Sequence, residues 1–131
     1  MMKFLVVEDE FTTRLILQKI LGEHGEVHIA ANGREAVQAV KQACQCGELY
    51  NLITLDVIMP EMDGQAALKE IRDLESGYSI PHAKRARIIM TTAMNDGKNI
   101  MAAFKEQCDG YLIKPINRSK LENFIAEIEN I

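Results

Sequence analysis

The residue with the clearest chemical potential in this sequence is Asp56. It ends an apolar run of strand length, Leu52 to Leu55, and precedes a short loop and a segment from Gly64 onward that has helical spacing. A carboxylate at the end of a buried strand must be paired, bound to a metal ion or kept in water. We therefore treat Asp56 as a candidate reactive group; the alternative is an aspartate that only caps the turn after the strand.

Further polar residues follow other apolar runs in the same way. Glu8 and Asp9 follow the first run, Thr92 follows the fourth and Lys114 follows the fifth. In a parallel sheet the carboxyl ends of the strands lie along one edge, and open α/β sheets bind ligands at that edge. We therefore expect these side chains to converge on Asp56.

The residue types in this set favour phosphoryl chemistry with a divalent cation. Converging carboxylates repel one another unless a cation joins them, and oxygen ligands suit Mg²⁺, which also takes phosphate as a ligand. The ammonium of Lys114 and the hydroxyl of Thr92 could bind phosphoryl oxygens. Together these groups indicate an aspartyl phosphate formed on Asp56.

Each partner of Asp56 also has a purely structural interpretation. Glu8 and Asp9 could complement the dipole at the start of the following helix, although this does not explain the acid opposite them. Thr92 could be a cap or turn hydroxyl, and Lys114 could be a solvated lysine. The convergence of all of them favours the phosphoryl site.

Five apolar runs alternate with five segments of helical spacing. The expected strands are Lys3–Val7, Val27–Ala31, Leu52–Leu55, Arg87–Thr91 and Gly110–Ile113. The expected helices are Thr12–Leu21, the segment between Asn32 and Gly47, Gly64–Glu75, Gly97–Gln107 and Asn117–Asn130. Continuous apolar strands that alternate with helices predict a five-stranded parallel sheet covered by helices on both faces.

Two local features of these helices are specific enough to check. In the first helix, the pairs Ile16/Ile20 and Leu17/Leu21 are spaced four residues apart, which predicts that all four share one buried face. Before the second helix, Asn32 has the side chain of a good N-cap.

Composition limits the class of protein. The 131 residues fit one domain, 1–131, with a single core. The formal net charge of −4 disfavours nucleic acid as a primary ligand, and no apolar stretch is long enough to span a membrane. The three cysteines, Cys44, Cys46 and Cys108, lack zinc-site spacing. With no secretory signal at the N-terminus, we expect reduced thiols and a cytoplasmic location.

A basic cluster precedes the fourth strand. It consists of His82, Lys84, Arg85 and Arg87, in a connection that is longer than its counterparts elsewhere in the chain. A solvated loop accounts for such a cluster, and so does a docking patch for an acidic partner.

The motifs at the strand ends resemble those of the response-regulator receiver domain of two-component signalling, and the length is similar to that of the single-domain chemotaxis type. The resemblance covers essentially the whole chain. It rests on Val7-Glu8-Asp9, Leu55-Asp56-Val57-Ile58-Met59-Pro60, Asp63-Gly64, Thr92-Ala93 and Gly110-Tyr111-Leu112-Ile113-Lys114-Pro115.

The resemblance implies a strand order of 2-1-3-4-5 and a flavodoxin-like fold of the receiver type. It also implies that Asp56 accepts a phosphoryl group from a histidine kinase or phosphotransfer protein. Mg²⁺ would be held by Glu8, Asp9, Asp56 and the backbone carbonyl of Ile58. Such a protein is a signalling module that catalyses its own phosphorylation and dephosphorylation, rather than an enzyme with a separate substrate.

The resemblance further implies how the signal leaves the site. Thr92 and Lys114 would bind phosphoryl oxygens, and Tyr111 would be an aromatic switch that turns inward when Thr92 moves; the alternative for Tyr111 is an ordinary half-buried strand aromatic. The surface of the last two helices and the strand between them would meet a downstream protein or form a phosphorylation-dependent homodimer. The Lys114-Pro115 bond is expected to be cis.

We expect a stand-alone receiver domain, and three alternatives compete with this interpretation. The chain could be the N-terminal receiver of a longer regulator with an output domain. A haloacid-dehalogenase-type phosphatase would need a second acid two residues after Asp56, where this chain has Ile58. A flavodoxin-like FMN binder would need a phosphate-binding loop after the first strand, where the acids Glu8 to Glu10 would repel phosphate.

Ile58 and Met94, apolar where many relatives are polar, predict a long-lived phosphoryl group.

Overall fold

The structure is a computed structural model that describes residues 2–59, 62–93 and 108–129. These residues form a five-stranded parallel sheet in the order β2-β1-β3-β4-β5, which confirms the expected fold class. The strands are β1 (Met2–Val7), β2 (Gly25–Ala30), β3 (Leu52–Asp56), β4 (Arg87–Thr92) and β5 (Gly110–Ile113). The helices are α1 (Phe11–Gly22), α2 (Gly33–Cys46), α3 (Gly64–Gly77), α5 (Arg118–Glu129) and the 3₁₀ turn η1 (His82–Lys84). The expected helix at 97–107 and Met94 lie outside the described residues.

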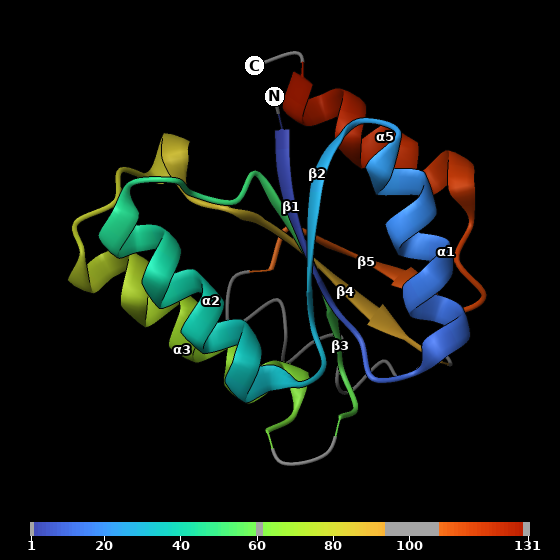
Figure 1. The fold of residues 1–131 in the computed structure, drawn as a ribbon, viewed down its shortest axis with the longest axis horizontal. Helices are drawn as coiled ribbons and strands as arrows, with labels where there is room; N and C mark the ends of the chain where they lie inside the picture. Colours follow the sequence, from blue (N-terminus) through green and yellow to red (C-terminus); the bar gives the residue numbers. More distant parts are fainter. Residues whose placement is uncertain (1, 60–61, 94–107, 130–131) are drawn as a thin grey trace.

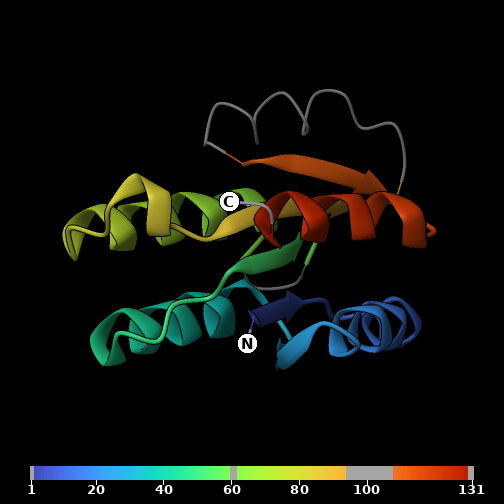
Figure 2. The same cartoon turned by 90° about the horizontal axis from the view of Figure 1, so that it is seen from above.

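The helices cover both faces of the sheet, as predicted. Figures 1 and 2 show α2 and α3 on one face and α1 and α5 on the other. Each face has its own apolar core. Val40, Leu55 and Ile71 belong to the core beneath α2 and α3, and Leu17 and Ile125 belong to the one beneath α1 and α5.

Burial differs between the central and the edge strands. Every residue of β3 is buried, whereas in the edge strand β5 buried and exposed residues alternate. This is the expected result when only the central strands have neighbours on both sides and helices on both faces. None of the helices in the described part of the chain has the length and apolar character that a bilayer-spanning helix needs.

Helix α1 is less buried than its sequence predicts. Leu17, Ile20 and Leu21 pack in the core, but Ile16 is 38% exposed, so the prediction of four inward residues was wrong for Ile16. Leu15, at 52% exposure, lies on the same outer side. The buried face of α1 is therefore formed by Leu17, Ile20 and Leu21, without Ile16.

The register of the sheet places the carboxyl ends of the strands together. Val7 of β1 pairs with Leu55 of β3, and Asp56 pairs with Thr91 of β4. Thr92 in turn pairs with Ile113, the residue before Lys114. The polar residues singled out in the sequence therefore emerge from four strands at one edge.

Candidate functional site

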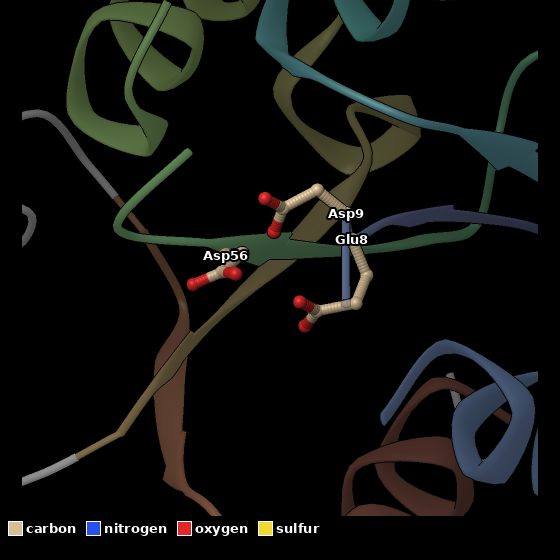
Figure 3. Close-up of side chains that lie close together, drawn as sticks. All are labelled: Glu8, Asp9 and Asp56. Carbon is tan, nitrogen blue, oxygen red and sulfur yellow. The ribbon is translucent and has the colours of Figure 1, made fainter. Parts of the chain in front are cut away.

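Three carboxylates meet at the carboxyl edge of the sheet. Glu8 and Asp9 directly follow β1, and Asp56 is the last residue of β3 (Figure 3). One oxygen from each of the three lies within 4.8 Å of the others. Glu8 is fully buried and Asp56 is 5% exposed, while Asp9 is exposed, so the cluster opens to solvent on the side of Asp9.

Lys114 joins two of these carboxylates. Its Nζ donates to Oδ2 of Asp56 and to Oε2 of Glu8, each at 3.1 Å. The backbone holds this lysine in position, because its N–H donates to the carbonyl of Thr92 at 2.7 Å. The Lys114-Pro115 bond is cis, as expected.

The backbone around Asp56 fixes its carboxylate. The N–H of Ile58 donates to Oδ1 at 3.2 Å, which leaves Oδ2 to Lys114. The N–H of Val57 continues the ladder to the carbonyl of Thr91. Gly64 approaches from α3 so closely that a Cβ there would lie 2.1 Å from the carbonyl oxygen of Asp56. The start of α3 therefore locks the end of β3 in place.

The electrostatics of the cluster depend on burial. Burial raises the pKa of Glu8 to about 7, with further contributions from the hydrogen bond and negative charge of Asp56, while Lys114 acts in the opposite direction. Burial alone would lower the pKa of Lys114, but the carboxylates of Glu8 and Asp56 raise it overall. The lysine is therefore firmly charged, and Glu8 ionises with difficulty.

The donor set is suited to a hard divalent cation. Lys114 Nζ lies 3.1 Å from Glu8 Oε1 as well, but it donates to Oε2, which leaves Oε1 buried without a hydrogen bond. An unsatisfied buried carboxylate oxygen beside two more carboxylates is a free ligand position for an oxygen-preferring ion. Glu8, Asp9 and Asp56 thus fit Mg²⁺; the role of the Ile58 carbonyl stays a prediction.

The acid that contacts the start of α1 is Glu10, rather than Glu8 or Asp9, for which a helix-dipole role was the structural alternative. Glu10 is the N-cap of α1, and its side chain accepts a hydrogen bond from the N–H of Thr13. This cap was not predicted because Glu is not a preferred N-cap residue. Since Glu10 caps the helix, Glu8 and Asp9 remain available to the cluster.

Two further predicted residues lie on the neighbouring strands. Thr92 ends β4 and is 3% exposed, beside the strand that delivers Lys114. Tyr111 in β5 is 40% exposed and points outward. Their proposed roles in binding phosphate and in switching stay predictions.

Comparison with known proteins identifies the family of the chain. The model of the response regulator receiver domain matches residues 4–126. The chain is 31% identical over 130 residues to the chemotaxis protein CheY of Bacillus subtilis, covering 98% of both chains. It is 36% identical over 127 residues to the osmosensing histidine protein kinase SLN1 of Saccharomyces cerevisiae, which covers 95% of this chain but only 10% of SLN1.

Solved structures give the same result. The receiver domain of the histidine kinase CKI1 from Arabidopsis thaliana, complexed with Mg²⁺ and BeF₃⁻, has a TM-score of 0.81 and 30% identity, covering 99% of this chain and 91% of that one. The receiver domain of Ssk1 from S. cerevisiae, in a co-crystal with the phosphotransfer protein Ypd1, has a TM-score of 0.81 and 33% identity, covering 96% of this chain and 87% of that one. The chain belongs to the response regulator receiver domain family of two-component signalling.

Proposed function

We propose that this chain is a phosphorylation-dependent switch and that Asp56 is its phosphoacceptor. The observation that carries the proposal is the position of the Asp56 carboxylate, which is held by Lys114 and the Ile58 N–H and lies beside Glu8 and Asp9. The proposed donor is the phosphohistidine of a histidine kinase or of a phosphotransfer protein. The complex of the Ssk1 receiver with Ypd1 and the similarity to SLN1 support this class of donor.

The chemistry is a transfer between two nucleophiles. A carboxylate oxygen of Asp56 attacks phosphorus, the phosphorus–nitrogen bond of the donor breaks, and the bonding pair returns to the imidazole nitrogen. Mg²⁺, bound by Glu8, Asp9 and Asp56, would neutralise charge on the transferring group. Lys114 is placed to bind the transferred phosphoryl group, because its ammonium already contacts Oδ2 of the Asp56 carboxylate.

The switch follows from the change in partners of Lys114 and Thr92. Before phosphorylation the lysine bridges Asp56 and Glu8. A phosphoryl group on Asp56 offers stronger acceptors to the ammonium of Lys114 and to the hydroxyl of Thr92. Because Thr92 ends β4 and Lys114 directly follows the neighbouring strand β5, their movement would reach the surface on which Tyr111 lies.

An apolar surface on α1 is the proposed docking site for the donor. Phe11, Leu15 and Ile16 are 65%, 52% and 38% exposed. Arg14 on the same turn donates to the carbonyl of Glu8 at 3.3 Å, so the start of α1 lies against the phosphoacceptor site. A donor that covers these side chains can present its phosphohistidine to Asp56.

Phosphorylation by a small donor tests the assignment of Asp56. After incubation with acetyl phosphate and Mg²⁺, intact-mass measurement should show one added phosphoryl group. The Asp56→Asn variant should gain none, whereas Asp73→Asn, which changes an exposed aspartate on α3, should be modified like the parent. Equal modification of Asp56→Asn and the parent would disprove the assignment.

A further inference from the structure

The basic connection before β4 has a composition unlike the rest of this acidic chain. No aspartate or glutamate occurs from residue 76 to residue 95, although the protein has a net charge of −4. Within this stretch Lys84, Arg85 and Arg87 follow one another closely around the end of η1. We call these three residues the basic corner. The sequence allowed either a solvated loop or a docking patch here, and the contacts of these residues bear on the choice.

The basic corner is held on a fixed backbone. The N–H of Lys84 donates to the carbonyl of Pro81 at 2.8 Å, and Arg85 Nε donates to the carbonyl of Ile80 at 3.0 Å. Arg87 belongs to β4, and its N–H donates to the carbonyl of Asn51 at 3.0 Å. These bonds order the backbone before any partner binds. A binding surface here would therefore lose less conformational entropy on binding.

The acids nearest to the basic corner are already used by other groups. Glu75 is 3% exposed and accepts from Arg72 and from the N–H of Ala86, each at 2.8 Å. Asp109 Oδ2 accepts from Arg72 at 3.0 Å and from the N–H of Ile88 at 2.8 Å. Among the described residues, the side chains of the basic corner therefore form no ion pair.

Two hollows lie on either side of the basic corner, and Arg85 and Arg87 line both. One, of about 310 Å³, also has His82 and Arg72 in its wall. The other, of about 340 Å³, has Lys84 in its wall together with the apolar atoms of Leu49, Tyr50 and Ile128. In the second hollow, cationic side chains thus lie beside apolar ones.

We propose that the basic corner and its two hollows dock an acidic segment of a partner protein. Aspartate and glutamate side chains of that segment would pair with Arg85 and Arg87, whose guanidinium groups suit carboxylates. An apolar side chain of the segment would enter the hollow lined by Leu49, Tyr50 and Ile128. This apolar wall and the acidic remainder of the surface favour a peptide over nucleic acid, which needs a broad basic face.

This surface is separate from the phosphorylation site. Arg87 pairs with Leu52 at the start of β3, whereas Asp56 at its end pairs with Thr91. Four residues of strand separate the two, a distance of about 13 Å. In Figure 1, η1 lies at the upper left, away from the strand arrowheads that mark the opposite edge. A docked partner would leave Asp56 accessible and would be held at a high local concentration beside the switch.

Fluorescence anisotropy with a defined probe tests the proposal without any phosphodonor, so the result does not depend on Asp56. The probe is a short labelled peptide rich in Asp and Glu around a central leucine. Reversing two cations in Lys84→Glu/Arg87→Glu should weaken its binding by about tenfold. Neither side chain makes a hydrogen bond in the described part of the structure, so the variant should keep the parent's melting temperature. The matched variant Arg34→Glu/Lys41→Glu, on α2, should bind like the parent.

Changes to the probe test the two parts of the surface. Replacing the central leucine by serine should weaken binding, because the leucine is expected to enter the hollow lined by Leu49, Tyr50 and Ile128. A DNA single strand of equal charge should bind more weakly than the peptide. Tighter binding of the DNA, an equal loss in the α2 variant, or no binding of the peptide at low salt would each overturn the proposal.

Discussion

At the scale of single residues, the site is defined by charges that do not balance without a further cation. Glu8, Asp9 and Asp56 lie together, and the ammonium of Lys114 pairs with two of them, Glu8 and Asp56. The buried member, Glu8, responds with a pKa raised to about 7, because its charged form loses hydration and faces Asp56. Clustered acids of this kind store repulsion that a divalent cation relieves.

The raised pKa of Glu8 predicts how metal-free stability depends on pH. Glu8 has a pKa of about 7 in the folded protein against its ordinary 4.5, so the folded state holds the proton more tightly. Its contribution to stability is full below pH 4.5 and is lost as the pH rises through about 7. In EDTA, raising the pH from 5 to 8 should therefore lower the free energy of unfolding, measured with urea, more in the parent than in Glu8→Gln. Parallel curves for the two proteins would contradict the raised pKa.

The residue two positions after Asp56 should slow hydrolysis of the phosphoryl group. Ile58 is 67% exposed beside the acceptor and offers no hydrogen bond to orient an attacking water. Ile58→Asn supplies such a group and should shorten the phosphoryl half-life by about tenfold. The measurement is the decay of phosphorylated protein after donor removal. Ile29→Asn, the same change at an exposed position of β2, should decay like the parent; equal half-lives for both variants would refute this role.

At the scale of elements, the close contact between β3 and α3 positions the acceptor. A Cβ on Gly64 would lie 2.1 Å from the Asp56 carbonyl oxygen and 2.9 Å from Val57 Cα, and both are backbone atoms that cannot move independently. Gly64→Ala should therefore lower the free energy of unfolding by about 1–3 kcal/mol and slow phosphorylation of Asp56. Urea denaturation measures the first effect and intact mass the second.

A second helix glycine provides the control for Gly64. Nothing lies within 4 Å of a Cβ built on Gly22 at the end of α1. Gly22→Ala should leave phosphorylation unchanged and should stabilise the fold slightly, by about 0.4–1 kcal/mol. Destabilisation of both variants to the same extent would mean that the contact with Asp56 is not the cause.

The exposed face of α1 should matter only for a protein donor. Leu15→Asp places a charge in the apolar surface proposed for docking and should slow phosphotransfer from a histidine phosphotransfer protein by about tenfold or more. Phosphorylation by acetyl phosphate, which needs no docking, should be unchanged. Tyr78→Asp alters an aromatic that is 40% exposed at the end of α3 and should have no effect on either donor. Equal slowing with acetyl phosphate would instead indicate a damaged acceptor site.

The sequence predicted the elements well where its signals depend on burial. The central strands are mainly apolar, which indicated a parallel sheet. The Asn32 side chain caps α2 by accepting from the N–H of Glu35 at 2.9 Å. The convergence of Glu8, Asp56 and Lys114 followed from the topology alone. The exposure of Ile16 could not be predicted, because it depends on how α1 is rotated against the sheet. The cap by Glu10 was missed because Glu is not a preferred N-cap residue.

At the scale of the whole molecule, the sheet separates two functions. Its carboxyl edge carries Asp56, the proposed phosphoacceptor, and its amino edge carries the basic corner of Lys84, Arg85 and Arg87. We expect a change of partners at Lys114 to pass sideways between β5 and β4, because Thr92 pairs with Ile113, the residue before Lys114. Phosphorylation should then alter one side of the molecule and leave the amino edge unchanged.

Amide NMR with beryllofluoride as the phosphoryl mimic tests this view of the molecule. Adding it with Mg²⁺ should shift amides near the acceptor and, beyond them, those of Thr92 and of residues 110–120, because Thr92 and Lys114 turn toward the new acceptor. Amides of residues 80–87, at the opposite edge, should move little, and Asp56→Asn should show none of these shifts. Shifts confined to the loops that carry Glu8, Asp9 and Asp56 would refute the switch. Large shifts at residues 80–87 would show instead that the two edges are coupled, and a partner docked at the basic corner would then sense phosphorylation directly.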